Sequence, residues 1–245
     1  MKNLFIAILL CTVLTARADA PVLEAVTQDY PPMSYIEGDR VTGFSTDILH
    51  AMAAQAGLHT HIAVLPWARA YQTALSQPDT LIYTITRIPE RENLFEWIGP
   101  ITPRRIFLFK LRERKDIQIK SAADVYHYKV GLVREMATSK IALQKKILDE
   151  NKIDFAPTPE SNLKKLFLGR VDLIVTLDWN AYYQARQLGY SADQIEPALL
   201  IDDTIDYYFA LSKHSDPALL QKLRAAWEHV KASGQVETLR TRYLN

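Results

Sequence analysis

Residues 28–35 read Gln-Asp-Tyr-Pro-Pro-Met-Ser-Tyr, and residues 41–49 read Val-Thr-Gly-Phe-Ser-Thr-Asp-Ile-Leu. The apolar run 22–27 comes directly before this stretch and predicts a short strand that ends at the two prolines. Ser45 or Thr46 can cap a helix, because the apolar residues that follow recur at helical spacing. A strand, a tight turn and a helix are therefore expected to open the fold.

Strand-like and helix-like segments continue to alternate after this opening. Strands are expected over residues 59–65, 80–85, 105–111, 129–133, 171–177 and 206–211, and helices over 67–76, 139–151, 161–168, 179–188 and 217–233. Such alternation predicts an α/β fold, with helices packed on largely parallel sheets.

The charged stretch 112–116 and the polar stretch 202–206 predict where the chain passes between two lobes. With hinge crossings near 106–111 and 202–205, residues 21–105 and 206–245 form one lobe and residues 112–201 form the other. A cleft between two such lobes is a natural site for a small molecule.

The composition excludes several classes of protein. The 245 residues are 48% hydrophobic and 23% charged, which is typical of a globular protein. The 29 Lys and Arg residues nearly balance the 28 Asp and Glu residues, so we expect no nucleic-acid partner. The one cysteine, Cys11, excludes a disulfide framework and a cysteine-based zinc site.

Residues 1–20 read as a cleaved secretory signal peptide. Lys2 precedes an uncharged, mostly apolar run over 4–14, and small residues stand at peptidase spacing before Ala20. The alternative is an uncleaved anchor. We therefore expect a periplasmic location and a soluble mature protein.

Five motifs, in order, resemble the bacterial solute-binding proteins of family 3, the polar amino-acid receptors of ABC transporters. They are the opening quoted above, Thr-Ile-Thr-Arg-Ile-Pro-Glu-Arg at 84–91, Phe-Glu-Trp-Ile-Gly-Pro at 95–100, Lys-Val-Gly-Leu-Val at 129–133 and Gly-Arg-Val-Asp-Leu-Ile-Val at 169–175. The resemblance covers residues 21–245 and implies the two-lobed, hinged periplasmic binding protein fold of type II.

The resemblance implies that Arg91 holds a ligand carboxylate. A guanidinium suits this role because it can donate two parallel hydrogen bonds to one carboxylate. Arg87 is the rival candidate within the same motif. The other interpretation of Arg91 is a surface side chain paired with Glu90 or Glu92.

Other first-lobe candidates follow from the same motifs. Thr84 and Thr86 stand where the family places ligand-facing hydroxyls, and Tyr30 and Trp67 where it often places aromatic rings around the ligand. Arg69 could add a second contact to an anion. The competing interpretation is that the threonines end a strand and the rings belong to the core.

The second lobe departs from the family pattern at two places. Where amino-acid receptors usually have a Gly-Ser/Thr-Thr turn, this chain has Arg134-Glu-Met-Ala-Thr. Leu177 stands at the spacing of the acid that binds the ligand's α-ammonium, with Asp178 one residue later. Arg134 and Asp178 are therefore the second-lobe candidates, and the ligand either reaches Asp178 or lacks an α-amino group.

No catalytic motif or cofactor-binding loop is evident, so we expect no enzyme activity and no cofactor. His59 and His61 would share a strand face without a third metal ligand, and the acidic residues at 202–206 lack calcium-loop spacing, so no metal is expected. The alternative is an enzyme on the same scaffold, such as a cyclohexadienyl dehydratase using Glu135 or Asp178 as general acid.

The expected function is capture of a small polar solute, an amino acid or a related carboxylate or amine, in the cleft between the lobes. The expected partners are the small molecule and an inner-membrane ABC permease or sensor, and the protein is expected to be a monomer.

Overall fold

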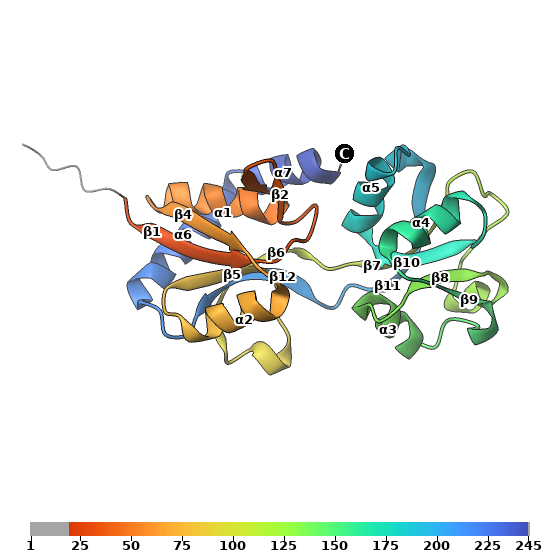
Figure 1. Ribbon diagram of the computed structural model, residues 1–245, viewed down its shortest axis with the longest axis horizontal. Helices are drawn as coiled ribbons and strands as arrows, with labels where there is room; N and C mark the ends of the chain where they lie inside the picture. Colours follow the sequence, from red (N-terminus) through yellow and green to blue (C-terminus); the bar gives the residue numbers. More distant parts are fainter. Residues whose placement is uncertain (1–19, 245) are drawn as a thin grey trace, which may run out of the picture.

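The computed structural model describes residues 20–244 and contains two sheets, each covered by helices (Figure 1). The first sheet has the spatial order β4-β1-β5-β12-β6, made by β1 (Val22–Thr27), β4 (His59–Val64), β5 (Thr80–Thr86), β6 (Phe95–Pro103) and β12 (Asp206–Ser212). β1 is parallel to β4 and β5, whereas β12 is antiparallel to β5 and β6. The signal-peptide prediction, including Cys11, lies outside the described residues except for Ala20.

Helices cover both faces of the first sheet, and the sheet and these helices form the first lobe. One face packs on α1 (Phe44–Gln55), α6 (Pro217–Ala232) and α7 (Gln235–Leu244), and the other on α2 (Trp67–Ser76). β5 is central, and its nearly unbroken run of buried residues is typical of a strand covered on both sides.

The second sheet has the spatial order β11-β7-β10-β8-β9 and makes the second lobe. Its strands are β7 (Ile106–Leu111), β8 (Val130–Val133), β9 (Ile153–Ala156), β10 (Leu173–Leu177) and β11 (Ile195–Asp202), and its helices are α3 (Ala137–Gln144), α4 (Pro159–Phe167) and α5 (Asp178–Gln187). α3 packs on one face, and α4 and α5 pack on the other. A hairpin of β2 (Tyr35–Glu37) and β3 (Arg40–Thr42) extends the first lobe, and short 3₁₀ turns cover Pro89–Arg91, Ala122–His127, Glu150–Lys152 and Ala192–Gln194.

The position of β7 corrects one predicted boundary. Residues 106–111, predicted as a hinge crossing, pair with β10 and β11 inside the second sheet, and their apolar side chains are buried there. The chain passes between the sheets at residues 104–105 and 203–205, where the Arg104 amide donates to the Ile205 carbonyl over 2.9 Å. We propose that the second lobe is residues 106–202.

The opening turn is built differently from the expectation. α1 begins at Phe44 after Gly43, whose φ is 121°, and neither predicted cap residue caps the helix. The first helical amides instead donate to the carbonyls of Pro32 and Met33. A Cβ on Gly43 would lie 2.6 Å from the Met33 backbone, so this close approach requires glycine.

Within residues 20–244, none of the helices combines the length and the apolar character that crossing a membrane requires.

Candidate functional site

A guanidinium group lies at the carboxyl edge of the first sheet. Arg91, on the 3₁₀ turn after β5, donates from Nη1 to Thr86 Oγ1 at 2.9 Å and to the Thr86 carbonyl at 3.2 Å. Its guanidinium lies 5.3 Å from the ring centre of Trp67 and 5.4 Å from that of Tyr71. Arg91 has no ion pair with any carboxylate of residues 20–244, so it keeps N–H donors for an incoming acid. The structure thus brings together three predicted residues, Trp67, Thr86 and Arg91.

Arg87 points to a different partner. Its Nε donates to Glu92 Oε2 over 2.8 Å, and its guanidinium lies over the rings of Trp97 and Tyr208. These rings belong to the sheet face that α2 covers. Because Arg87 already has a carboxylate partner, it is the weaker candidate for holding a ligand acid.

Thr84 combines two unusual features. Its φ is 59°, a conformation that β-branched residues rarely adopt, and it lies where the ladder between β5 and β12 shifts register. The residue is 3% exposed, and its Oγ1 has no hydrogen-bond partner. Strain and an unsatisfied buried hydroxyl are features that cluster at functional sites.

Tyr30 extends from the turn after β1 and packs against the cores of both lobes. Its hydroxyl lies 3.0 Å from that of Tyr207, the second residue of β12. Burial is the main cause that raises the pKa of both hydroxyls. Both tyrosines therefore stay neutral near pH 7 and remain able to donate hydrogen bonds.

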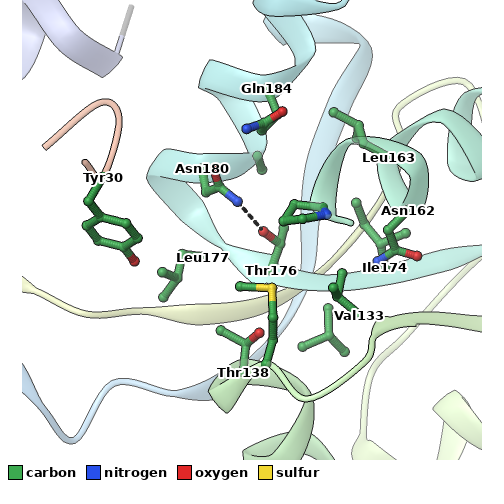
Figure 2. A pocket seen from close by; sticks show the side chains of 14 residues that line it. Tyr30, Val133, Thr138, Asn162, Leu163, Ile174, Thr176, Leu177, Asn180 and Gln184 are labelled. Atoms are coloured by element: carbon green, nitrogen blue, oxygen red, sulfur yellow. Dashed lines mark hydrogen bonds between the residues drawn. The ribbon is translucent and has the colours of Figure 1, made fainter. Parts of the chain in front are cut away.

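The second lobe contributes a cavity at the ends of β8 and β10 (Figure 2). Figure 2 shows Tyr30 entering from the first lobe beside Leu177, with Asn180 and Gln184 on α5. Asn180 Nδ2 donates to Thr176 Oγ1 over 3.4 Å. The lining combines apolar side chains, such as Met136, with amides and hydroxyls, and no lining residue is charged.

The other predicted residues lie outside this arrangement. Arg69 is exposed on α2, and the guanidinium of Arg134 lies 5.0 Å from the ring centre of Phe155, on the second lobe. Asp178 is buried next to the hinge, where Arg105 Nε donates to its Oδ2 over 2.9 Å. Its other carboxylate oxygen accepts from the Trp179 amide, so Asp178 is not free to pair with a ligand ammonium.

Of the two general acids considered for the enzymatic alternative, Glu135 is poorly suited to that role. The Glu135 side chain is 89% exposed, and its hydrogen bond to Lys140 lowers the pKa of its carboxyl. A general acid needs the opposite shift, toward the working pH. Among residues 20–244, no group of three or more His, Cys, Asp or Glu side chains gathers to hold a metal, and His61 pairs with Glu24 over 2.6 Å.

Sequence reasoning missed Tyr71, Tyr207 and Arg104. Tyr71 could have been found, because it lies one helical turn after Trp67 and shares its face. Tyr207 and Arg104 reach the cleft only because two crossing segments, distant in sequence, lie side by side. No local motif marks either residue.

Solved structures match the chain over nearly its full length. Substrate-binding domain 2 of Lactococcus lactis GlnP, in an open conformation, is 18% identical with a TM-score of 0.76, covering 94% of this chain and 97% of that one. An ancestral cationic amino acid solute-binding protein is 21% identical with a TM-score of 0.73, covering 91% and 96%. A histidine kinase sensor domain similar to periplasmic binding proteins is 19% identical with a TM-score of 0.66, covering 94% and 98%. These matches confirm the predicted two-lobed α/β fold.

The sequence itself has one informative match. A search of curated proteins finds no significant relative. The family model of "Bacterial extracellular solute-binding proteins, family 3" matches residues 23–245. The resemblance stated from the five motifs is thereby confirmed, and the chain belongs to family 3 of the bacterial extracellular solute-binding proteins.

Proposed function

We propose that the protein captures a small carboxylate-bearing solute between its lobes and releases it unchanged. The observation that carries this proposal is the Arg91 guanidinium, which Thr86 and two aromatic rings orient and which has no acidic partner of its own in residues 20–244. A bidentate pair with a carboxylate would complete its hydrogen bonding. Trp67 and Tyr71 would flank the bound group.

The second lobe supplies the contacts that make binding depend on closure. Tyr30 already touches the second-lobe core, and the cavity behind it offers apolar surface with amide and hydroxyl groups. A ligand on Arg91 that also fills this cavity interacts better with the closed form than with the open form. That difference in affinity is what moves the equilibrium toward closure.

The setting in the cell is part of the proposal. We infer that the signal at residues 1–20 is cleaved, and that the mature protein is a periplasmic monomer that presents its closed form to an ABC permease or a membrane sensor. Binding and release need no chemical step, so the proposal includes no enzyme activity. The family membership and the pairing of Glu135 with Lys140 support this view.

A thermal-shift screen of carboxylates, amino acids, polyamines and neutral sugars tests the proposal. Carboxylates should raise the melting temperature, and small-angle scattering should then record a more compact particle. If only polyamines or sugars stabilise the protein, or if no carboxylate does, the proposal fails. Turnover of prephenate or arogenate by the purified protein would instead favour the dehydratase.

A further inference from the structure

Arg104 is a buried arginine on the first of the two hinge crossings. The residue is 8% exposed, and its Nη1 is buried without a hydrogen-bond partner. Its side chain lines a narrow pocket between the lobes, together with Tyr30, Tyr207 and Asn180. This cavity adjoins the larger second-lobe cavity, because Tyr30, Leu177 and Asn180 line both.

The positive charge of Arg104 is not compensated. Arg104 forms no ion pair within residues 20–244, and Asp178 is the one acidic residue lining its cavity. The Asp178 carboxylate already accepts from Arg105 and from the Trp179 amide. The Tyr207 hydroxyl offers Arg104 a neutral hydrogen-bond partner but no opposite charge. A buried guanidinium without an ion-pair partner is unfavourable unless another group supplies that charge.

A row of polar groups connects Arg104 with Arg91. Tyr207 lies directly opposite Thr86 in the β5–β12 ladder, so their side chains share one face of the sheet. Thr86 holds Arg91, and Tyr207 lines the cavity of Arg104 and contacts the Tyr30 hydroxyl. Burial keeps both tyrosine hydroxyls protonated, and since one of them donates to the other, the pair keeps one O–H donor for a ligand.

We propose that Arg104 binds a second anionic group, and that the ligand is a small dicarboxylate without an amino group. The inference rests on the proposed function, in which Arg91 holds the first carboxylate. Neither cavity offers a free acid to an ammonium group, since Asp178 is engaged and the lining of the larger cavity is uncharged. Two arginines without an ion-pair partner in residues 20–244, and no free acid lining the two cavities, match a dianion.

Calorimetry on the native protein tests the charge pattern without relying on any variant. The probes are malonate, succinate, glutarate and adipate, with butyrate and valerate as matched monocarboxylates and glutamate as the amino-bearing diacid. The best dicarboxylate should bind roughly ten- to a hundredfold more tightly than its matched monocarboxylate. The monocarboxylate lacks the charged hydrogen bond to Arg104, and the loss of such a bond weakens binding by about this factor. Glutarate should bind at least about tenfold more tightly than glutamate. The ammonium group of glutamate would be desolvated on binding without gaining an acidic partner.

Two variants then locate the second site. Arg104→Met keeps an unbranched side chain and should remove the preference for the dicarboxylate, while the affinity for the monocarboxylate stays within about twofold. Tyr207→Phe should weaken dicarboxylate binding by roughly fivefold. Arg112→Met is the matched control, because Arg112 is exposed and pairs with Glu196 on the second lobe. It should bind every probe as the native protein does.

The possible failures are distinguishable. Equal affinity for mono- and dicarboxylates, tighter binding of glutamate, or an unchanged preference in Arg104→Met would overturn the dicarboxylate inference while leaving carboxylate capture by Arg91 intact. If no carboxylate binds the native protein, the proposed function fails together with the inference. Should Arg104→Met not fold, the native comparison and Tyr207→Phe still decide the matter.

Discussion

Arg91→Ala is the most direct test of how the cleft recognises an acid. The substitution removes the guanidinium that would pair with the ligand carboxylate, together with its bonds to Thr86 and its stacking on Trp67 and Tyr71. Truncating one partner of a desolvated, hydrogen-bonded charge pair costs about 2–4 kcal/mol of binding free energy. That cost corresponds to a roughly 30- to 1,000-fold loss of affinity.

The unliganded protein should tolerate this change. No carboxylate of residues 20–244 depends on Arg91, so its removal leaves no acid unpaired. The lost hydrogen bonds and cation–π contacts amount to about 2 kcal/mol. Native stabilities are about 5–15 kcal/mol, so the variant should remain folded.

A thermal-shift measurement with the best carboxylate of the screen separates the loss of ligand affinity from the loss of stability of the unliganded variant. At a ligand concentration of about 100 times the native Kd, binding stabilises the native protein by about 2.7 kcal/mol, or about 5–11 °C for a chain of this size. A variant that binds 100-fold more weakly gains about 0.4 kcal/mol, or about 1–2 °C.

Arg87→Ala is the matched control, because the same substitution four residues earlier removes an arginine already paired with Glu92. It should keep the full ligand-induced shift. The reasoning is refuted if Arg91→Ala keeps the native shift, or if Arg87→Ala loses it while the unliganded variant stays folded.

Three further predictions concern residues around the cleft. Thr84→Val keeps the β-branched shape but removes an unpartnered buried hydroxyl. The free energy of unfolding should therefore rise by about 1 kcal/mol in urea titrations, while ligand affinity falls. A destabilised variant would contradict this prediction. Burial raises the pKa of Asp178 above its usual 3.8, so this carboxyl lowers stability as pH rises through and above about 3.8. The stability of Asp178→Asn relative to the native protein should therefore increase with pH over that window, and a decrease would reject the shift. Trp179→Ala empties a buried site between the lobes, so chemical denaturation should show a loss of about 3–5 kcal/mol, and a loss below about 1 kcal/mol would show that the contact is unimportant.

Local patterns predicted the framework of the protein because backbone chemistry acts over short distances. Asp216 caps α6 as expected, with its carboxylate accepting from the Ala218 amide over 2.8 Å and Pro217 at the first helical position. Gly57 ends α1 with a φ of 62°, also as expected. The prediction that Ser45 or Thr46 caps α1 was wrong, because a tertiary contact of the Gly43 backbone takes the place of a local side-chain cap.

The candidate site was predicted less completely, because it forms where distant segments meet. Thr86 and Arg91 belong to one short motif, so the sequence alone identified both residues as candidates. Arg104 lies on one crossing segment and Tyr207 lies at the start of the strand after the other, and their separation of about a hundred residues carries no periodic signal. Asp178 was named from spacing alone, and the structure shows Arg105 already bound to it.

The contacts between the lobes determine which residues drive closure. The Trp179 ring lies 4.5 Å from that of Phe44 within the first-lobe core, and it follows Asp178, which binds Arg105 on the hinge. A rotation of the lobes about the hinge moves the parts of the cleft farthest from the hinge most. Trp67 lies in such a part, because it follows β4, the edge strand farthest from β12 and β6. A ligand bound by Arg104 as proposed would be held on the hinge itself, so we expect this contact to change little between the open and closed forms. It therefore contributes affinity and selectivity, whereas the ligand contacts that bridge the Arg91 edge to the second-lobe cavity shift the equilibrium toward closure.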